Sequence, residues 1–370
     1  MQFAFAWRVV ALALTAVAAA TALSGCGALV SREAERHWPA PLHTDSGQVV
    51  VYGRSEQKTA DAAKHFATMA LFSQAVYRMD LPPSERWGSA CKYLEPGQSV
   101  PAFGMPSSSQ GSWARWTGSK WACMDNGGLQ YETYVFSTAD GHPHSAVLAF
   151  RGTENVQGQA LRDWTSNIMA ALGMEPPEYK LAQTAVKRLV GDLKAAAPNI
   201  KIYATGHSLG GGLAQQAGYL SQSIEEVYAF DPSPVTNWSQ MAIHDYFSAQ
   251  EGGPALIEKQ NPTVFRIFHQ HEALEPIRDV ASRFASKGLK RTDYEFFFGT
   301  PEKAEAKLGV REMAQLHSMA MLACNLMRAF DGPSADFWLT RNFADSLLRG
   351  DYVAPETGDN PICPHDLRLK

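Results

Sequence analysis

The sequence Gly206-His207-Ser208-Leu209-Gly210 separates a β-prone segment, 201–205, from a helix-prone segment rich in small residues, 209–224. A serine between glycines at a strand-to-helix turn is typical of a nucleophile elbow, because the glycines allow the backbone to turn sharply and lift the serine oxygen clear of the sheet. The turn also brings the next backbone N–H, that of Leu209, and the positive end of a helix close to the reacting atom. We therefore expect Ser208 to be a nucleophile, and His207 to be a packing residue beside the turn.

Strand-like and helix-like segments alternate on both sides of this turn. The expected strands are 130–137, 146–150, 200–205, 226–230 and 264–268, and the expected helices are 60–79, 178–196, 209–223 and 310–330. Such alternation predicts a mostly parallel sheet flanked by helices. The first two strands are joined by Asp140-Gly141-His142-Pro143, which favours a turn between paired strands. With 370 residues, of which 45% are hydrophobic, the chain can build one large α/β domain with insertions.

The N-terminus has the pattern of an export signal. Arg8 precedes an uncharged apolar run, 9–23, that is short for a membrane span. The run ends in Leu23-Ser24-Gly25-Cys26, which resembles the cleavage box of bacterial lipoproteins. That resemblance implies cleavage before Cys26 and acylation of this cysteine as a membrane anchor, and Gly27 in place of Asp favours the outer membrane of a Gram-negative bacterium. The alternative is an ordinary secretory signal with an unrelated cysteine.

The expected organisation is a signal peptide at 1–25, a tether at 26–54, and one domain at 55–370 with an irregular insertion at about 82–128. The insertion is rich in Trp, Gly, Ser and Pro. Segment 287–307 is charged and aromatic, and we expect it to be an excursion from the regular fold. A net charge of −4, with no basic stripe or tail, argues against nucleic-acid binding.

Apart from Cys26, the chain has four cysteines, an even number that suggests two disulfides in an exported protein. Three pairings are possible. We expect Cys91–Cys123 and Cys324–Cys363, because each of these pairs closes a loop within one region of the chain. Free buried cysteines are the alternative.

A serine hydroxyl becomes an effective nucleophile only when an imidazole takes its proton and a carboxylate orients that imidazole. In chains with this elbow the partners follow in the order Ser, then Asp or Glu, then His. His317 fits best as the base, because it follows the last expected core strand and starts an apolar helical stretch. His365 lies in the tail beside a proline, whereas His269 and His271 end a strand and come before or beside the acid.

Two carboxylates lie where the acid is needed. Asp231 and Glu272 each follow an expected strand downstream of Ser208, and either could reach the histidine. Asp279 is a weaker third candidate. Asp231 could instead be a turn residue before Pro232, and Glu272 could be a solvated loop charge. The residues alone leave the acid open.

An oxyanion hole needs a second donor, besides the N–H of Leu209, from the loop after an earlier strand. The sequence Phe150-Arg151-Gly152-Thr153 ends such a strand. Gly152 permits close backbone approach, and Thr153 can offer both a backbone N–H and a hydroxyl group. We therefore expect Thr153 and Leu209 to supply the two donors.

Three blocks of the sequence together resemble the class 3 (fungal-type) lipases of the α/β-hydrolase superfamily. They are Ala149-Phe150-Arg151-Gly152-Thr153 with Asp163-Trp164-Thr165-Ser166-Asn167, then Thr205-Gly206-His207-Ser208-Leu209-Gly210-Gly211, then Phe265-Arg266-Ile267-Phe268 with an acidic residue and a later histidine. The resemblance covers roughly residues 60–329. It implies an α/β-hydrolase fold, in which a mostly parallel central sheet is flanked by helices. We expect irregular insertions stapled by disulfides around this core.

Carried onto this chain, the resemblance implies a site made of Ser208 as nucleophile, His317 as base, and Thr153 and Leu209 as oxyanion donors. The family's acid follows the strand that here ends near Phe268, which selects Glu272 and leaves Asp231 as the alternative. The family has Asp followed by an apolar residue and Pro, whereas this chain has Glu272-Ala273-Leu274-Glu275-Pro276. Segment 154–162, where the family has a lid, is short and polar here, which argues against lid-controlled activation. No metal and no cofactor are implied.

These features predict a monomeric serine hydrolase that cleaves carboxylic esters of acyl lipids through an acyl-enzyme intermediate, as a triacylglycerol lipase or a phospholipase does. Its expected partners are the lipid substrate and, through the N-terminal anchor, a membrane. Two other functions remain open: an acyltransferase that uses the same triad, and a non-catalytic binding module of the cell envelope.

Overall fold

The computed structural model describes residues 36–37, 49–53, 57–78, 81, 85–86, 90–98, 104–126, 128–152, 177–275, 291–297, 310–329, 343–344 and 347–348. The predicted signal peptide, the predicted anchor Cys26 and the predicted disulfide residue Cys363 lie outside these ranges. So do Thr153, Asp279 and His365. Among the described helices, none is long and apolar enough to cross a membrane.

The described strands form one sheet in the order β1-β2-β11-β10-β9-β8-β7-β6-β4-β3, and β5 pairs with β6 beside this path. Neighbours from β1 to β7 in this order are parallel, whereas β6 runs antiparallel to β7, β4 and β5. The strands are β1 Arg36–His37, β2 Val49–Gly53, β3 Ser107–Ser108, β4 Gly111–Arg115, β5 Cys123–Asn126, β6 Leu129–Thr138, β7 Pro143–Phe150, β8 Lys201–His207, β9 Ile224–Phe230, β10 Thr263–His269 and β11 Arg291–Phe297.

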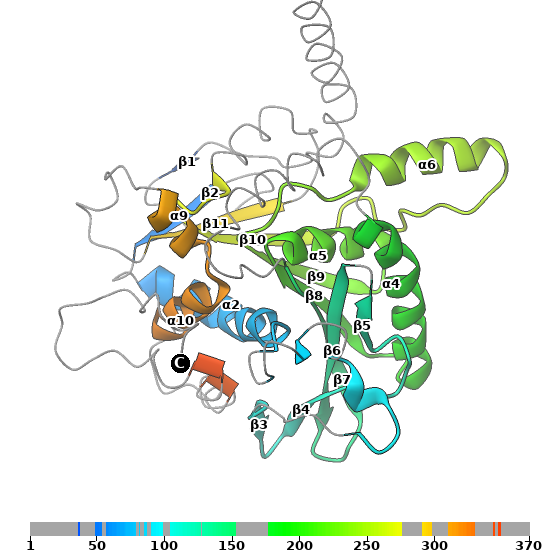
Figure 1. Ribbon diagram of the computed structural model, residues 1–370, viewed down its shortest axis with the longest axis horizontal. Coiled ribbons are helices and arrows are strands. Elements are labelled where there is room, and N and C mark those ends of the chain that lie inside the picture. Colours follow the sequence, from blue (N-terminus) through cyan, green and yellow to red (C-terminus); the bar gives the residue numbers. More distant parts are fainter. Residues whose placement is uncertain are drawn as a thin grey trace, which may run out of the picture.

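Helices cover both faces of this sheet (Figure 1). They are α2 Gln57–Ala75, α4 Pro177–Ala196, α5 Leu209–Leu220, α6 Trp238–Gln250, α9 Val310–Leu316 and α10 Met319–Ala329, with a short 3-10 helix, η2, at Lys92–Leu94. One apolar core joins α2 and α10 to the sheet, and the other joins α4 and α5 to its opposite face. This architecture, with a strand-to-helix turn at the end of β8, is the predicted α/β-hydrolase fold.

Alternation along the strands explains why there are two cores. In β7, Val147 and Ala149 face α2 and α10, while Ala146 and Leu148 face α4 and α5. Helix α4 buries residues spaced three and four apart, which gives one apolar stripe for the sheet: Tyr179, Ala182, Ala185, Val186, Leu189, Val190 and Leu193. Both faces of the central strands are thus covered, as expected for a parallel sheet.

The N-terminal tether differs from the prediction. Strands β1 and β2 both fall within 26–54, and β2 pairs in parallel with β11 along Val49 to Gly53. The short β-branched run Val49-Val50-Val51 is long enough for a sheet strand, although the polar residues around it give the whole segment the composition of a linker. Residues 49–53 are therefore part of the sheet.

Segment 287–307 also contributes to the sheet instead of being only an excursion. Its residues Arg291–Phe297 form β11, which lies between β2 and β10. The charged residues of this segment argued against a buried strand. In the structure the charge of the buried Asp293 is balanced by the buried Arg266 of β10, which donates two hydrogen bonds to it. Tyr294 and Phe296 join the core under α2.

The predicted insertion at about 82–128 is partly regular. Strands β4 and β5 within it pair with β6 and extend the sheet by antiparallel strands. The structure contains the predicted Cys91–Cys123 disulfide, which links the residue before η2 to the first residue of β5. Cys324 is disulfide-bonded too, and its predicted partner Cys363 lies outside the described residues.

The predicted helix 310–330 consists of two helices. Helix α9 ends at Leu316 and α10 begins at Met319, so that His317 and Ser318 lie between them. Helix α10 packs against α2 on one face of the sheet. The break places His317 in a short connection close to the ends of the central strands.

Candidate active site

Ser208 occupies a strained turn between β8 and α5. Its backbone has φ 58° and ψ −124°, a conformation that non-glycine residues rarely adopt and that is typically found at functional sites. Its N–H donates to the carbonyl oxygen of Phe230 on the neighbouring strand at 3.0 Å. A Cβ atom on Gly206 would lie 2.2 Å from the carbonyl oxygen of Gly210, so the turn can close only around glycine. The predicted sharp turn between strand and helix is present, and the role of Ser208 as nucleophile stays a prediction.

Two backbone features beside Ser208 concern the predicted oxyanion hole. Leu209 is the first residue of α5, so its N–H is one of the helix N–H groups without a partner inside the helix. Gly152, just after β7, lies against the elbow: a Cβ atom there would be 3.0 Å from Cβ of Ser208 and 2.4 Å from the carbonyl oxygen of His207. Thr153, the other predicted donor, follows directly but lies outside the described residues.

His317 and Glu272 form a buried pair. Nδ1 of His317 and Oε2 of Glu272 are 2.6 Å apart, and the two side chains are 6% and 0% exposed. The same Oε2 accepts a hydrogen bond from the N–H of Leu274 at 2.8 Å. Because a carboxylate can only accept, the hydrogen of neutral His317 lies on Nδ1, and the lone pair that can take a proton lies on Nε2.

Asp231, the alternative acid, is held differently. It is fully buried, its Oδ1 accepts from the N–H of His269 at 3.0 Å, and its Oδ2 lies 3.9 Å from Nε2 of His207. Its φ of 39° places it in the left-handed region at the end of β9. The carboxylate that accepts the hydrogen bond from Nδ1 of His317 is that of Glu272. The geometry agrees with Glu272 as the partner of the histidine.

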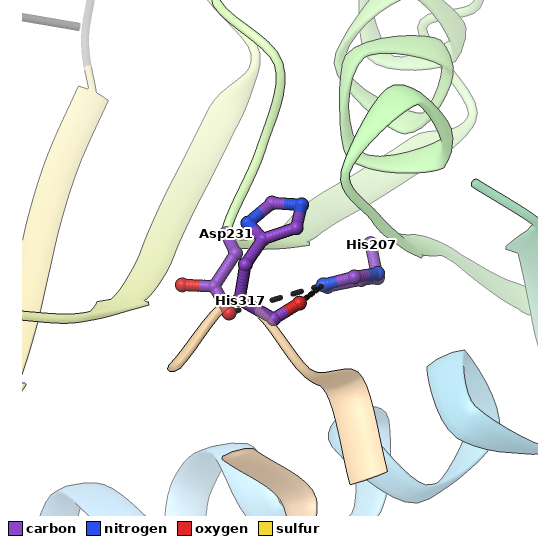
Figure 2. Close-up of side chains that lie close together, drawn as sticks. All are labelled: His207, Asp231 and His317. Atoms are coloured by element: carbon purple, nitrogen blue, oxygen red, sulfur yellow. Dashed lines mark hydrogen bonds and ion pairs between the residues drawn. The ribbon is translucent and has the colours of Figure 1, made fainter. Parts of the chain in front are cut away.

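His207 has more contacts than a packing residue needs. Its Nδ1 is 2.7 Å from the hydroxyl oxygen of Tyr77, and its Nε2 is 3.0 Å from the backbone carbonyl oxygen of His317. The rings of His207 and His317 have centroids 4.8 Å apart. Figure 2 shows the His207 ring directed at the His317 carbonyl and the Asp231 carboxylate. His207 thus links the turn at Ser208 to the backbone of His317, between α9 and α10.

His269 is a second buried histidine in the same region. Its Nδ1 is 2.6 Å from the carbonyl oxygen of Leu316, and its Nε2 is 3.3 Å from Nδ2 of Asn325. Burial lowers the pKa of His269 to about 4, so its ring is neutral near pH 7. The contacts of His269, Tyr77 and His207 have no signal in the sequence, because each of them joins segments that are far apart in the chain. His271, in contrast, is partly exposed beside Glu275.

One group of side chains in the described part of the chain could hold a metal ion. It consists of His207, Asp231 and His317, whose possible ligand atoms lie within 4.8 Å of one another (Figure 2). Nε2 of His207 is already hydrogen-bonded to the carbonyl oxygen of His317. Since a metal ligand needs its lone pair at the ion, binding there would require this contact to break. We therefore base no step of the chemistry on a metal.

Residues 68–232 match the Tle-like phospholipase domain, a phospholipase-like family. This segment contains the elbow, Gly152 and Tyr77, and it includes two of the three blocks that resemble class 3 lipases. Glu272 and His317 lie beyond it. No curated protein matches the chain. The resemblance to class 3 lipases stays a prediction.

Among solved structures, the chain is similar to an extracellular lipase of Serratia marcescens, with 14% identity and a TM-score of 0.42 over 75% of this chain. It spans 53% of that lipase. It is also similar to lipase II of Rhizopus niveus, with 15% identity and a TM-score of 0.31 over 60% of this chain and 77% of that one. A third similar structure is carboxyl esterase 2 of Tuber melanosporum, with 12% identity and a TM-score of 0.29 over 68% of this chain and 100% of that one. These likenesses are distant.

Proposed function

We propose that this protein is a serine ester hydrolase that cleaves carboxylic esters of acyl lipids, with phospholipids as the first substrate class to test. The observation that carries this proposal is the buried Glu272–His317 pair, connected through His207 to a strained serine at a nucleophile elbow. The match to a phospholipase-like domain supports a lipid ester as substrate.

The proposed reaction begins when Oγ of Ser208 attacks the ester carbonyl carbon while Nε2 of His317 takes the serine proton. Glu272 stabilises the resulting imidazolium through Nδ1. The N–H of Leu209 and a donor from Thr153 bind the negative oxygen of the tetrahedral intermediate. Collapse of this intermediate breaks the bond between the acyl carbon and the alkoxy oxygen, and His317 gives its proton to that oxygen, so that the alcohol leaves and the acyl group stays on Ser208. Water then attacks the acyl-enzyme by the same route and releases the fatty acid and free Ser208.

A surface feature supports contact with lipid. Helix α6 exposes three large apolar side chains at spacings of three and one, Ile243, Tyr246 and Phe247, which are 58%, 65% and 59% exposed. Asp245 on the same helix is turned to the backbone N–H groups of Leu256 and Ile257. Tyr and Phe are favoured where protein meets the membrane interface. Figure 1 shows α6 projecting from the rest of the described fold.

The test is a substrate panel: diacyl phospholipid vesicles, triacylglycerol emulsion, and short- and long-chain p-nitrophenyl esters. Wild type should hydrolyse at least one long-chain lipid ester, and Ser208→Ala should lower kcat by at least about 10³-fold. Ser223→Ala, a change at a partly buried serine between α5 and β9, is the matched control and should retain activity. Product analysis with and without an alcohol acceptor separates hydrolysis from acyl transfer. Hydrolysis that persists in Ser208→Ala would refute the proposal.

We also propose that Cys26 is acylated and anchors the protein to the outer membrane of a Gram-negative bacterium. The support is the sequence Leu23-Ser24-Gly25-Cys26 after an apolar run. Two acyl chains are needed for stable anchoring, and a cysteine-linked diacylglycerol supplies them. Cys26→Ala should move the protein from the membrane fraction to the soluble fraction after cell lysis. Unchanged membrane recovery of this variant would contradict the anchor.

A further inference from the structure

Two imidazoles flank the connection that carries His317. His207 is the last residue of β8 and His269 is the last residue of β10, so both lie at the same edge of the parallel sheet. Each ring has one nitrogen on a backbone carbonyl oxygen of two consecutive residues: His269 on Leu316 and His207 on His317. The two contacts therefore hold the two consecutive peptide groups on either side of Cα of His317.

These carbonyls need partners for a general reason. Helix α9 ends at Leu316, and the last carbonyl groups of a helix have no N–H donor within that helix. The site is buried: His207, His269 and His317 are 5%, 2% and 6% exposed, so water is largely excluded. His269 of β10 supplies the donor that the last carbonyl of α9 lacks, and His207 of β8 supplies a donor to the next carbonyl, that of His317.

The partners also define which ring nitrogen carries the hydrogen. A carbonyl oxygen only accepts, so His207 donates from Nε2 and His269 donates from Nδ1. In the neutral rings the other nitrogens accept, Nδ1 of His207 from the hydroxyl of Tyr77 and Nε2 of His269 from the amide of Asn325. Both rings are thus fixed at both nitrogens.

We propose that His207 and His269 are positioning residues, which hold the carbonyls of His317 and Leu316 so that Nδ1 of His317 stays on Glu272. The inference rests on the proposed function, because it assigns a purpose to the orientation of the proposed base. Glu272 lies three residues after His269. The end of β10 therefore supplies both the proposed acid and the histidine that donates to the carbonyl oxygen of Leu316. Neither histidine touches the reacting atoms in this assignment.

Asn and Gln substitutions separate the two nitrogens of each ring. The amide of Asn reaches the position of Nδ1, and the amide of Gln reaches the position of Nε2. His207→Gln and His269→Asn therefore keep a donor on the carbonyl, whereas His207→Asn and His269→Gln lose it. The proposal predicts opposite rankings at the two positions: Gln above Asn at 207, and Asn above Gln at 269.

The experiment uses the full chain and p-nitrophenyl butyrate, with kcat, KM, thermal unfolding and low-field proton NMR for each variant. In His207→Asn and His269→Gln, kcat should be about 10- to 100-fold lower than in the matched variant, because small misplacements of a reacting group have effects of this size. KM should change by less than about threefold, since no substrate contact is removed. The low-field resonance of the Nδ1–H of His317 on Glu272 should be kept in His207→Gln and His269→Asn, and broadened or lost in the other two.

Equal kcat in the two variants of a pair, or a reversed ranking, overturns the inference for that position. A loss of kcat with an unchanged low-field resonance overturns it too. If the two His269 variants do not fold, the His207 pair decides the question. The failure of this inference differs from failure of the proposed function: in the first case Ser208→Ala is inactive while all four histidine variants match wild type, and in the second Ser208→Ala retains hydrolysis.

Discussion

Replacing Glu272 by Gln tests how the proposed base is supported, and the structure gives the expected size of the effect. Oε2 of Glu272 accepts two hydrogen bonds, from Nδ1 of His317 at 2.6 Å and from the N–H of Leu274 at 2.8 Å. In Glu272→Gln, both donors favour the amide oxygen at this position, because an NH₂ group there would face two N–H groups. The hydrogen of His317 should therefore remain on Nδ1.

What Glu272→Gln removes is the negative charge that stabilises the imidazolium in the transition state. A hydrogen bond to a charged group contributes roughly 1.5–3 kcal/mol, against about 1 kcal/mol for a neutral one. Because Gln keeps a neutral hydrogen bond, the loss is the difference between the two, up to about 2 kcal/mol in a buried site, which corresponds to a fall in kcat of up to roughly 30-fold. Glu272→Ala also removes the orienting oxygen, and we expect a fall nearer 10⁴-fold, the effect of losing the correct tautomer in a serine triad.

The assay is the initial rate of p-nitrophenyl butyrate hydrolysis, with thermal unfolding as the check on folding. Asp231→Asn is the matched control: its Oδ1 contact is to the backbone N–H of His269, and it should lower kcat by less than about tenfold. If Asp231→Asn is the inactive variant and Glu272→Gln keeps wild-type kcat, Glu272 is not the acid of the site.

Three further changes have defined outcomes. Gly152→Ala would place a Cβ atom 2.4 Å from the carbonyl oxygen of His207 and should lower kcat about 100-fold, whereas Gly191→Ala in α4, with nothing within 4 Å of the new atom, should leave kcat unchanged. Replacing Cys91 and Cys123 together by Ser should lower the free energy of unfolding by about 2–4 kcal/mol, measured by urea denaturation. Because burial lowers the pKa of His269 from 6.5 to about 4, the unfolded state takes up the proton first as pH falls. The free energy of unfolding should therefore fall by up to about 3 kcal/mol between pH 6.5 and pH 4 because of this residue. Urea denaturation at both pH values should show a smaller fall in His269→Asn.

The turn around Ser208 could be predicted from the sequence because its determinants are local. Gly206 and Gly210 are needed where the backbone passes within van der Waals contact of itself, and the flanking strand and helix follow in the next few residues. The position of Gly152 against Ser208 follows the same logic, since parallel neighbours β7 and β8 end at the same edge of the sheet.

The strands β2 and β11 were not predictable in the same way. Each is stabilised by a partner far away in the chain: Val49 pairs with Asp293, and the charge of Asp293 is satisfied by Arg266. Patterns within a short window cannot show such compensation, so the charge in β11 indicated an excursion. The register that joins these strands depends on distant contacts, as sheets generally do.

The choice between Glu272 and Asp231 depended on three-dimensional packing. Both follow parallel strands, and the residues alone gave no reason to prefer either of them. In the structure the N–H of Leu274 holds Oε2 of Glu272 beside His317, while the N–H of His269 holds Asp231. The supporting roles proposed for His207 and His269 depend on where α9 ends, which is a property of the tertiary structure.

Covalent labelling of Ser208 tests the central claim most directly. A p-nitrophenyl alkylphosphonate reacts with an activated serine and leaves a stable adduct that peptide mass spectrometry can locate. We expect one adduct, on the peptide that contains Ser208, with stoichiometric release of p-nitrophenol and parallel loss of esterase activity. Labelling should be absent in Ser208→Ala and slowed by at least about 10³-fold in His317→Ala. An adduct on another residue, or inactivation of Ser208→Ala at the wild-type rate, would contradict the assignment of Ser208 as the nucleophile.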